Sequence, residues 1–111
     1  MAKKEGTTKI VKRSELVKLL NEDLAREYQA IIAYTVYSQV LKGAKYMNIA
    51  GELEKHAGEE LQHAVKIAKQ VDYFGGMPTG TPKPVKLTED PREMLRAAAR
   101  ADRAIPRHES A

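Results

Sequence analysis

The feature that most constrains the fold is a pair of apolar stripes interrupted by acidic and imidazole side chains. Between residues 13 and 41 apolar side chains recur every three or four positions, as they do in an amphipathic helix. The members of this first stripe are Leu16, Leu20, Leu24, Glu27, Ile31, Tyr34, Ser38 and Leu41. The second stripe consists of Ile49, Leu53, His56, Glu60, His63, Ile67, Val71 and Phe74. Glu27, Glu60 and His63 therefore occupy positions where leucine is expected.

The turn between the two segments predicts that these three side chains meet. Gly43, Ala44 and Lys45 join the segments, and in an antiparallel pair residues equally far from the turn lie at the same height. Glu27 and Leu61 are both seventeen residues from Ala44, so Glu27 faces the Glu60–His63 pair. Residues three apart share one helix face. Burying two carboxylates is costly without a cation, and a divalent metal supplies one. The pattern predicts half of a carboxylate di-metal site.

The rest of the chain divides into an all-α arrangement around this hairpin. Residues 1–12 are expected to form a flexible basic arm and residues 13–74 the helical hairpin. Residues 75–89, rich in glycine and proline, are expected to cross the length of the bundle. A third, short helix is expected over 90–105. Asp90 and Glu93 have the spacing of a capping box, and Pro91 fits the first helical position. Residues 106–111 form the expected tail.

Composition narrows the possible functions. The 111 residues suffice for one small domain, and the absence of cysteine excludes disulfides and thiolate metal sites. The net charge of +4 comes mostly from the two ends and predicts solvated surface, so nucleic acid is not an expected partner. No run of eighteen apolar residues and no signal sequence is present, so no membrane association is expected. We therefore expect a soluble cytoplasmic protein, with residence inside a larger protein compartment left open.

Four motifs, taken together, resemble a known family. They are Glu27-Tyr28-Gln29-Ala30-Ile31, Glu59-Glu60-Leu61-Gln62-His63, Phe74-Gly75-Gly76-Met77-Pro78 and Glu93-Met94-Leu95-Arg96. In type and spacing they are similar to the first two and a half helices of a bacterioferritin-type protein of the ferritin-like superfamily. The similarity extends over roughly residues 10–102. The resemblance implies a four-helix bundle in which four glutamates and two histidines bind two irons, with ferrous iron oxidised before storage or detoxification.

The resemblance also implies roles for individual residues. Glu27 is the expected first-helix ligand, Glu60 the bridging carboxylate and His63 the imidazole ligand, which are also the expected catalytic groups. Tyr34 matches a tyrosine next to the metals, although a hydrogen-bonded core tyrosine is an equal alternative. Asp102 aligns with a third-helix glutamate ligand. Leu61 stands where the methionine that holds haem would fall, so haem is not expected.

One chain lacks the fourth helix of that bundle, so we expect the site to be completed by dimerisation. Two hairpins about a two-fold axis would bury both stripes as a four-helix bundle. The pair supplies four carboxylates and two imidazoles, a set that suits iron and tolerates manganese or zinc. The expected function is that of a ferroxidase, which transfers electrons from Fe(II) to dioxygen or peroxide in a homodimer or larger homo-oligomer.

Other interpretations remain open from the sequence. The hairpin could be a non-catalytic truncated module that acts in oligomerisation or as an adaptor for a ferritin-like partner. The alanine-rich ending also allows a chain cut or rearranged after residue 97. His56 and Glu59, together with Glu52, could form a route for iron into the site, or could be an exposed edge of the stripe.

Overall fold

Helices are the only regular secondary structure in the described part of the protein. The computed structural model describes residues 12–41 and 43–104, with only the backbone described at 44 and 101–104. In chain order it contains helix α2 (Arg13–Val40), the 3-10 turn η1 (Ala44–Tyr46), helix α3 (Met47–Tyr73) and helix α4 (Pro91–Ala104). These ranges contain no strand, which confirms the all-α class with a hairpin and a short third helix. Residues 1–11 and 105–111, which hold the expected tail and nearly all of the expected arm, lie outside this description.

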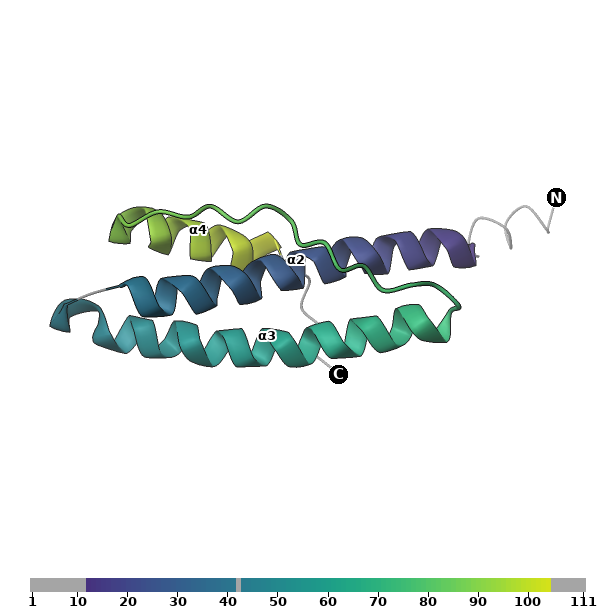
Figure 1. The fold of residues 1–111 in the computed structure, drawn as a ribbon, viewed down its shortest axis with the longest axis horizontal. Helices are drawn as coiled ribbons and strands as arrows, with labels where there is room; N and C mark the ends of the chain where they lie inside the picture. Colours follow the sequence, from purple (N-terminus) through teal and green to yellow (C-terminus); the bar gives the residue numbers. More distant parts are fainter. Residues whose placement is uncertain (1–11, 42, 105–111) are drawn as a thin grey trace.

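Helices α2 and α3 form a long antiparallel hairpin (Figure 1). Its first helix begins at Arg13, directly after the N-cap residue Lys12. Gly43 has φ of 98°, a left-handed conformation that costs glycine little and other residues more. The carbonyl of Gly43 accepts a hydrogen bond from the backbone N–H of Tyr46 at 3.0 Å. This glycine lets the chain reverse tightly enough for the two stripes to face each other.

The core consists of two apolar clusters separated along the hairpin. The cluster near the open end is formed by Leu24, Ala64, Ile67 and Val71. The cluster near the turn is formed by Ala30, Ala33, Tyr34, Tyr37, Leu41, Leu53, Met94 and Ala98. Glu27 falls between Leu24 and Ala30 on α2, and Glu60 falls between Leu53 and Ala64 on α3. The two glutamates therefore lie where one apolar cluster gives way to the other.

Residues 75–89 connect α3 to α4 as an extended segment that follows α2 (Figure 1). The segment has no helical or sheet hydrogen bonds of its own, and hydrogen bonds to α2 satisfy some of its backbone groups instead. The Asn21 amide donates to the Met77 carbonyl at 3.1 Å and accepts from the Thr79 N–H at 2.8 Å. Further along, the Lys83 N–H donates to the Ala25 carbonyl at 3.0 Å. The connection carries the chain back to the turn end, where α4 begins.

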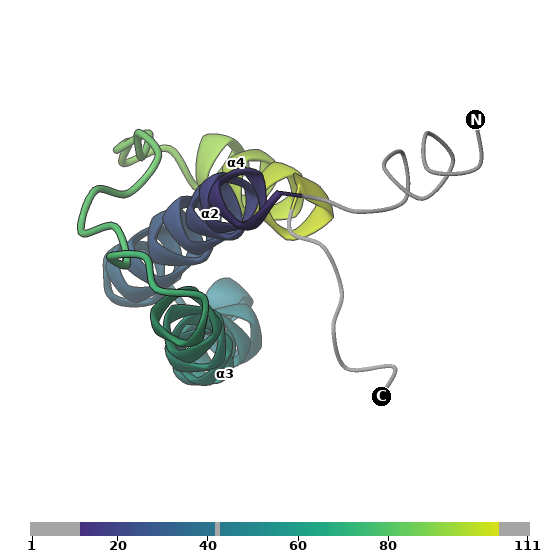
Figure 2. The ribbon, with the colours of Figure 1, turned by 90° about the vertical axis from the view of Figure 1, so that its right-hand side faces the viewer.

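Helix α4 packs against α2, and its Met94 and Ala98 join Leu53 of α3 in the cluster near the turn (Figure 2). The Asp90 carboxylate accepts a hydrogen bond from the Arg92 N–H at 2.9 Å, as an N-cap does. The reciprocal half of the expected capping box is wrong, because the Asp90 N–H donates to Thr88 Oγ1 instead. Glu93 binds Lys86 at 2.6 Å, and this hydrogen bond lowers the pKa of Glu93. The pair therefore stabilises the fold above the usual titration range of glutamate and loses that effect as pH falls through the lowered pKa.

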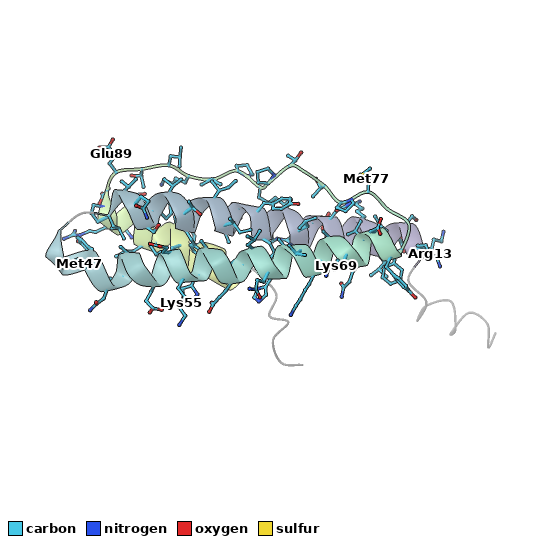
Figure 3. The ribbon with its side chains drawn as sticks, turned by 60° about the horizontal axis from the view of Figure 1, so that its bottom comes forward. Arg13, Met47, Lys55, Lys69, Met77 and Glu89 are labelled. Carbon is cyan, nitrogen blue, oxygen red and sulfur yellow. The ribbon has the colours of Figure 1, made fainter. Side chains whose placement is uncertain are left out.

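Two members of the predicted second stripe do not lie inward. Ile49 is 37% exposed and His56 is also exposed. The reason is that α4 makes no close backbone contact with α3 in the described part of the chain, so it covers this side of α3 only in part. Figure 3 shows Lys55 and Lys69 pointing away from the hairpin on α3, as expected for its polar face. No helix in the described ranges is both long and apolar enough to cross a membrane.

We expect Gly76→Ala to destabilise the protein by about 1–3 kcal/mol, because the junction after α3 has no room for a methyl group. A Cβ at this position would lie 2.5 Å from Val17 Cγ1, on a β-branched side chain that has little rotamer freedom. The matched control is Gly58→Ala in α3, where a Cβ meets nothing within 4 Å. That change should stabilise the helix by about 0.5–1 kcal/mol. Urea unfolding of both variants would contradict the prediction if Gly76→Ala were neutral.

Candidate metal centre

The three predicted ligands come together at the middle of the hairpin. Glu27 projects from α2 and is fully buried, and Glu60 projects from α3 and is 2% exposed. His63 lies one turn after Glu60, with a quarter of its side chain exposed. Helical periodicity accounts for this arrangement, because Glu60 and His63 share a face and that face meets α2 at the height of Glu27. One histidine edge therefore remains accessible while both carboxylates are covered.

The distances among the three side chains are short. His63 Nδ1 lies 2.7 Å from Glu60 Oε1 and 3.9 Å from Glu27 Oε1. One donor atom from each residue can be chosen so that all three lie within 4.8 Å of one another. The 2.7 Å contact fits an imidazole that carries a proton on Nδ1 and donates it to Glu60 Oε1. Nδ1 is therefore the histidine nitrogen directed at both carboxylates.

This donor set suits a divalent metal ion. Metal-to-donor bonds of about 2.1 Å place two donors of one ion at most about 4.2 Å apart. The two histidine-to-glutamate distances already satisfy that limit, and the remaining pair needs to close by no more than about 0.6 Å. Two carboxylates and one imidazole, with further positions open, are ligands that iron, manganese and zinc accept. The charge on the two buried carboxylates can be balanced by such an ion or by a protonated His63.

A cavity of about 310 Å³ opens onto the candidate centre. Glu60 and His63 form one part of its wall, and the exposed His56 and Glu59 form another. His56 Nδ1 lies 3.1 Å from Glu59 Oε1, and its Nε2 lies 4.0 Å from Glu52 Oε1. Two predicted ligands, Glu60 and His63, and two predicted route residues, His56 and Glu59, thus line the same opening. Glu27 does not line it, although it is fully buried next to Glu60 and His63.

Tyr34 is buried beside this cavity. Its hydroxyl donates a hydrogen bond to the Ala98 carbonyl on α4 at 3.5 Å, and its ring centroid lies 6.1 Å from that of His56. The hydroxyl is therefore a hydrogen-bonded core group, which is the second of the two alternatives that the sequence allowed for Tyr34. Because Tyr34 also lines the cavity, a role next to a bound metal stays a prediction.

Asp102 cannot be placed at the centre from this structure. It belongs to the last turn of α4, but its side chain lies outside the described residues. Its predicted role as a ligand therefore stays a prediction. In contrast, Leu53, Ala98 and Ala99 line the cavity and were not singled out as site residues. The small residues of α4 were a usable signal, since alanines at the height of a buried site leave space beside it.

Comparison with known proteins identifies the family of this chain. Residues 17–107 match the Ferritin-like domain family, which is most of the chain. The chain belongs to the ferritin-like family. Its all-helical architecture matches ferritin-like di-iron folds, and the structural relatives include "ferritin like, diiron-carboxylate proteins" from Bacillus anthracis. That structure shares 37% identity and a TM-score of 0.78 over 83% of this chain and 66% of that one.

Two other ferritin-like relatives are more distant. A bacterioferritin of Brucella melitensis biotype 1 is 27% identical over 94 residues. That alignment covers 84% of this chain and 55% of the relative, so this ferritin-like chain spans about half the length of that protein. A dodecameric thioferritin from Bacteroides fragilis, described as bacterioferritin-related, is 28% identical with a TM-score of 0.73. It is matched over 84% of this chain and 61% of its own.

Proposed function

We propose that this ferritin-like chain binds ferrous iron through Glu27, Glu60 and His63 and oxidises it to the ferric state in a homo-oligomer. The observation that carries the proposal is the convergence of two buried carboxylates and one imidazole from two helices within 4.8 Å. The family supports iron as the metal, and the Bacillus anthracis relative is named as a di-iron carboxylate protein. The substrate iron supplies one electron per Fe(II), and dioxygen or peroxide accepts it.

The protein's own groups have distinct tasks in this proposal. Glu27 and Glu60 provide negative charge that favours the more highly charged ferric product. Nδ1 of His63 can bind a metal only in the tautomer that carries the imidazole proton on Nε2. Metal binding would therefore replace the 2.7 Å contact between His63 Nδ1 and the Glu60 carboxylate. His56 and Glu59 lie on the solvent side of the same cavity, and we propose that they guide incoming cations toward Glu60 and His63.

Self-association is proposed to complete the ligand set. Met94 and Ala98 of α4 are buried against the hairpin on its α2 side. The cavity between α3 and α4 is the open side of the site, so a second copy would pack there. Its own two glutamates and histidine would raise the total to the four carboxylates and two imidazoles expected of a di-iron centre. The Brucella and Bacteroides relatives, a bacterioferritin and a dodecamer, support assembly into an oligomer.

Anaerobic titration of the whole chain with Fe(II), followed by addition of oxygen, tests the proposal. We expect saturation near about one iron per chain, because two half-sites share two metals. Mass measurement on the same sample should show a dimer or larger assembly, and oxidation monitored by ferric absorbance should exceed that in buffer. A chain that remains monomeric and metal-free would contradict the proposal and favour the adaptor function. Fe(II) oxidation no faster than in buffer would contradict the proposed ferroxidase activity.

A further inference from the structure

A second cavity, of about 250 Å³, lies between α2, the connecting segment and α4. Ala33 and Ala97 leave the space for it, and Pro84 and Val85 of the connecting segment form an apolar wall. Its residues are distinct from those of the cavity at Glu60 and His63. It therefore offers a binding site separate from the candidate metal centre, and its occupancy does not depend on the proposed ferroxidase function.

The polar groups of this cavity include several hydrogen-bond donors. The Tyr37 hydroxyl donates to the Lys86 carbonyl, and the Gln29 amide nitrogen donates to the Pro84 carbonyl at 2.6 Å. Both of these wall carbonyls thus already accept a hydrogen bond, and Gln29 keeps a second N–H. The remaining charged group is Arg100, whose planar guanidinium carries five N–H donors. A ligand that pairs with Arg100 and with the second N–H of Gln29 must offer hydrogen-bond acceptors.

The charges around the cavity point the same way. Lys86 is paired with Glu93 at 2.6 Å, which holds one cation at the rim in a fixed position. Among the described residues, no carboxylate lies within 4.0 Å of Arg100. Burial raises the pKa of Tyr37, while the positive charges of Lys86 and Arg100 act to lower it, so both cations lie within electrostatic range of this hydroxyl. The cavity therefore carries net positive charge above an apolar floor.

We propose that this cavity binds a small organic carboxylate, with Arg100 pairing with the carboxylate and the alanine and valine side chains receiving a short apolar tail. A guanidinium binds a carboxylate through two parallel N–H···O bonds, which gives both affinity and orientation. The apolar floor favours a ligand with a hydrocarbon portion over a purely inorganic oxyanion. Because the walls come from three elements, the ligand would also fasten α4 to α2.

Titration of the whole chain with sodium butyrate, followed by amide chemical shifts, tests this site. We expect saturable shifts around Gln29, Tyr37 and Ala97, and no saturable shifts with butyramide, which has the same shape without the charge. Arg100→Gln should weaken butyrate binding about tenfold or more, because a charged hydrogen-bonding partner is lost. Arg96→Gln is the matched control, because Arg96 is exposed on α4 as Arg100 is, but it does not line the cavity and it pairs with Glu93 at 3.6 Å.

Several results would overturn the proposal. Equal shifts with sodium chloride at the same ionic strength would show a general salt effect. Saturable binding of inorganic phosphate without binding of butyrate would show that the cavity binds an inorganic anion and not an organic carboxylate. Unchanged butyrate affinity in Arg100→Gln would remove Arg100 as the anchor. Should that variant fold poorly, Ala97→Val fills the cavity without changing charge and should also abolish butyrate binding.

Discussion

Replacing Glu60 with alanine is expected to weaken Fe(II) binding by at least about a hundredfold, since even groups that only support a ligand contribute 10–100-fold. Glu60 lies 2.7 Å from His63 Nδ1 and supplies one of the two buried carboxylates of the centre. Its removal deletes one donor and half of the negative charge that attracts the cation. Isothermal titration with Fe(II) under anaerobic conditions measures the loss directly, and oxidation on adding oxygen should fall to the rate in buffer.

The matched control for this change is Glu54→Ala, an exposed glutamate on the same helix. It alters the net charge equally, so a general electrostatic effect would appear in both variants. Stability gives a second measure. Glu60→Ala leaves a cavity where the side chain was, but it also relieves the repulsion between two buried carboxylates. The metal-free variant should therefore lose no more stability than the cavity alone would cost. Iron should raise the melting temperature of the parent protein but not of Glu60→Ala. Equal Fe(II) affinity in the two variants would contradict the assignment.

The central part of the site could be predicted from the sequence because it depends on helix geometry alone. Spacing of three residues puts Glu60 and His63 on one face, and equal distances from the turn bring Glu27 opposite them. Neither relation needs any knowledge of how α4 packs. The structure brings their donor atoms together as this geometry requires, and their role as metal ligands stays a proposal.

Other parts depend on contacts between distant segments, which periodicity does not encode. Ile49 and His56 have the spacing of inward residues, yet they are exposed because α4 packs mainly on α2 and covers this side of α3 only around Leu53. Glu93 has the spacing of a capping-box acid, but Lys86 from the connecting segment competes for its carboxylate. In both cases a partner far away in the sequence decides the outcome. The cavity near Arg100 has the same origin, since its walls come from three elements.

The position of α4 is also the basis of the second large effect. Met94→Ala is expected to destabilise the protein by about 2–5 kcal/mol. Met94 is fully buried among Tyr34, Tyr37 and Leu53 in the cluster near the turn, and it is the largest fully buried side chain that α4 contributes. Its loss leaves a cavity between α4 and the hairpin. Urea unfolding followed by circular dichroism measures the change.

Met77→Ala provides a control with the same chemistry, because Met77 is 82% exposed on the connecting segment and its contact with Asn21 uses only the backbone carbonyl. That change should shift the free energy of unfolding by no more than about 0.5 kcal/mol.

The Fe(II) affinity of Met94→Ala distinguishes the role of α4 from that of the hairpin. Glu27, Glu60 and His63 all lie on α2 and α3, so Met94→Ala should keep most of its Fe(II) affinity under conditions in which it remains folded. Similar stability of the two methionine variants would show that α4 is not packed as described, and a loss of iron binding as large as in Glu60→Ala would mean that α4 itself supplies a ligand.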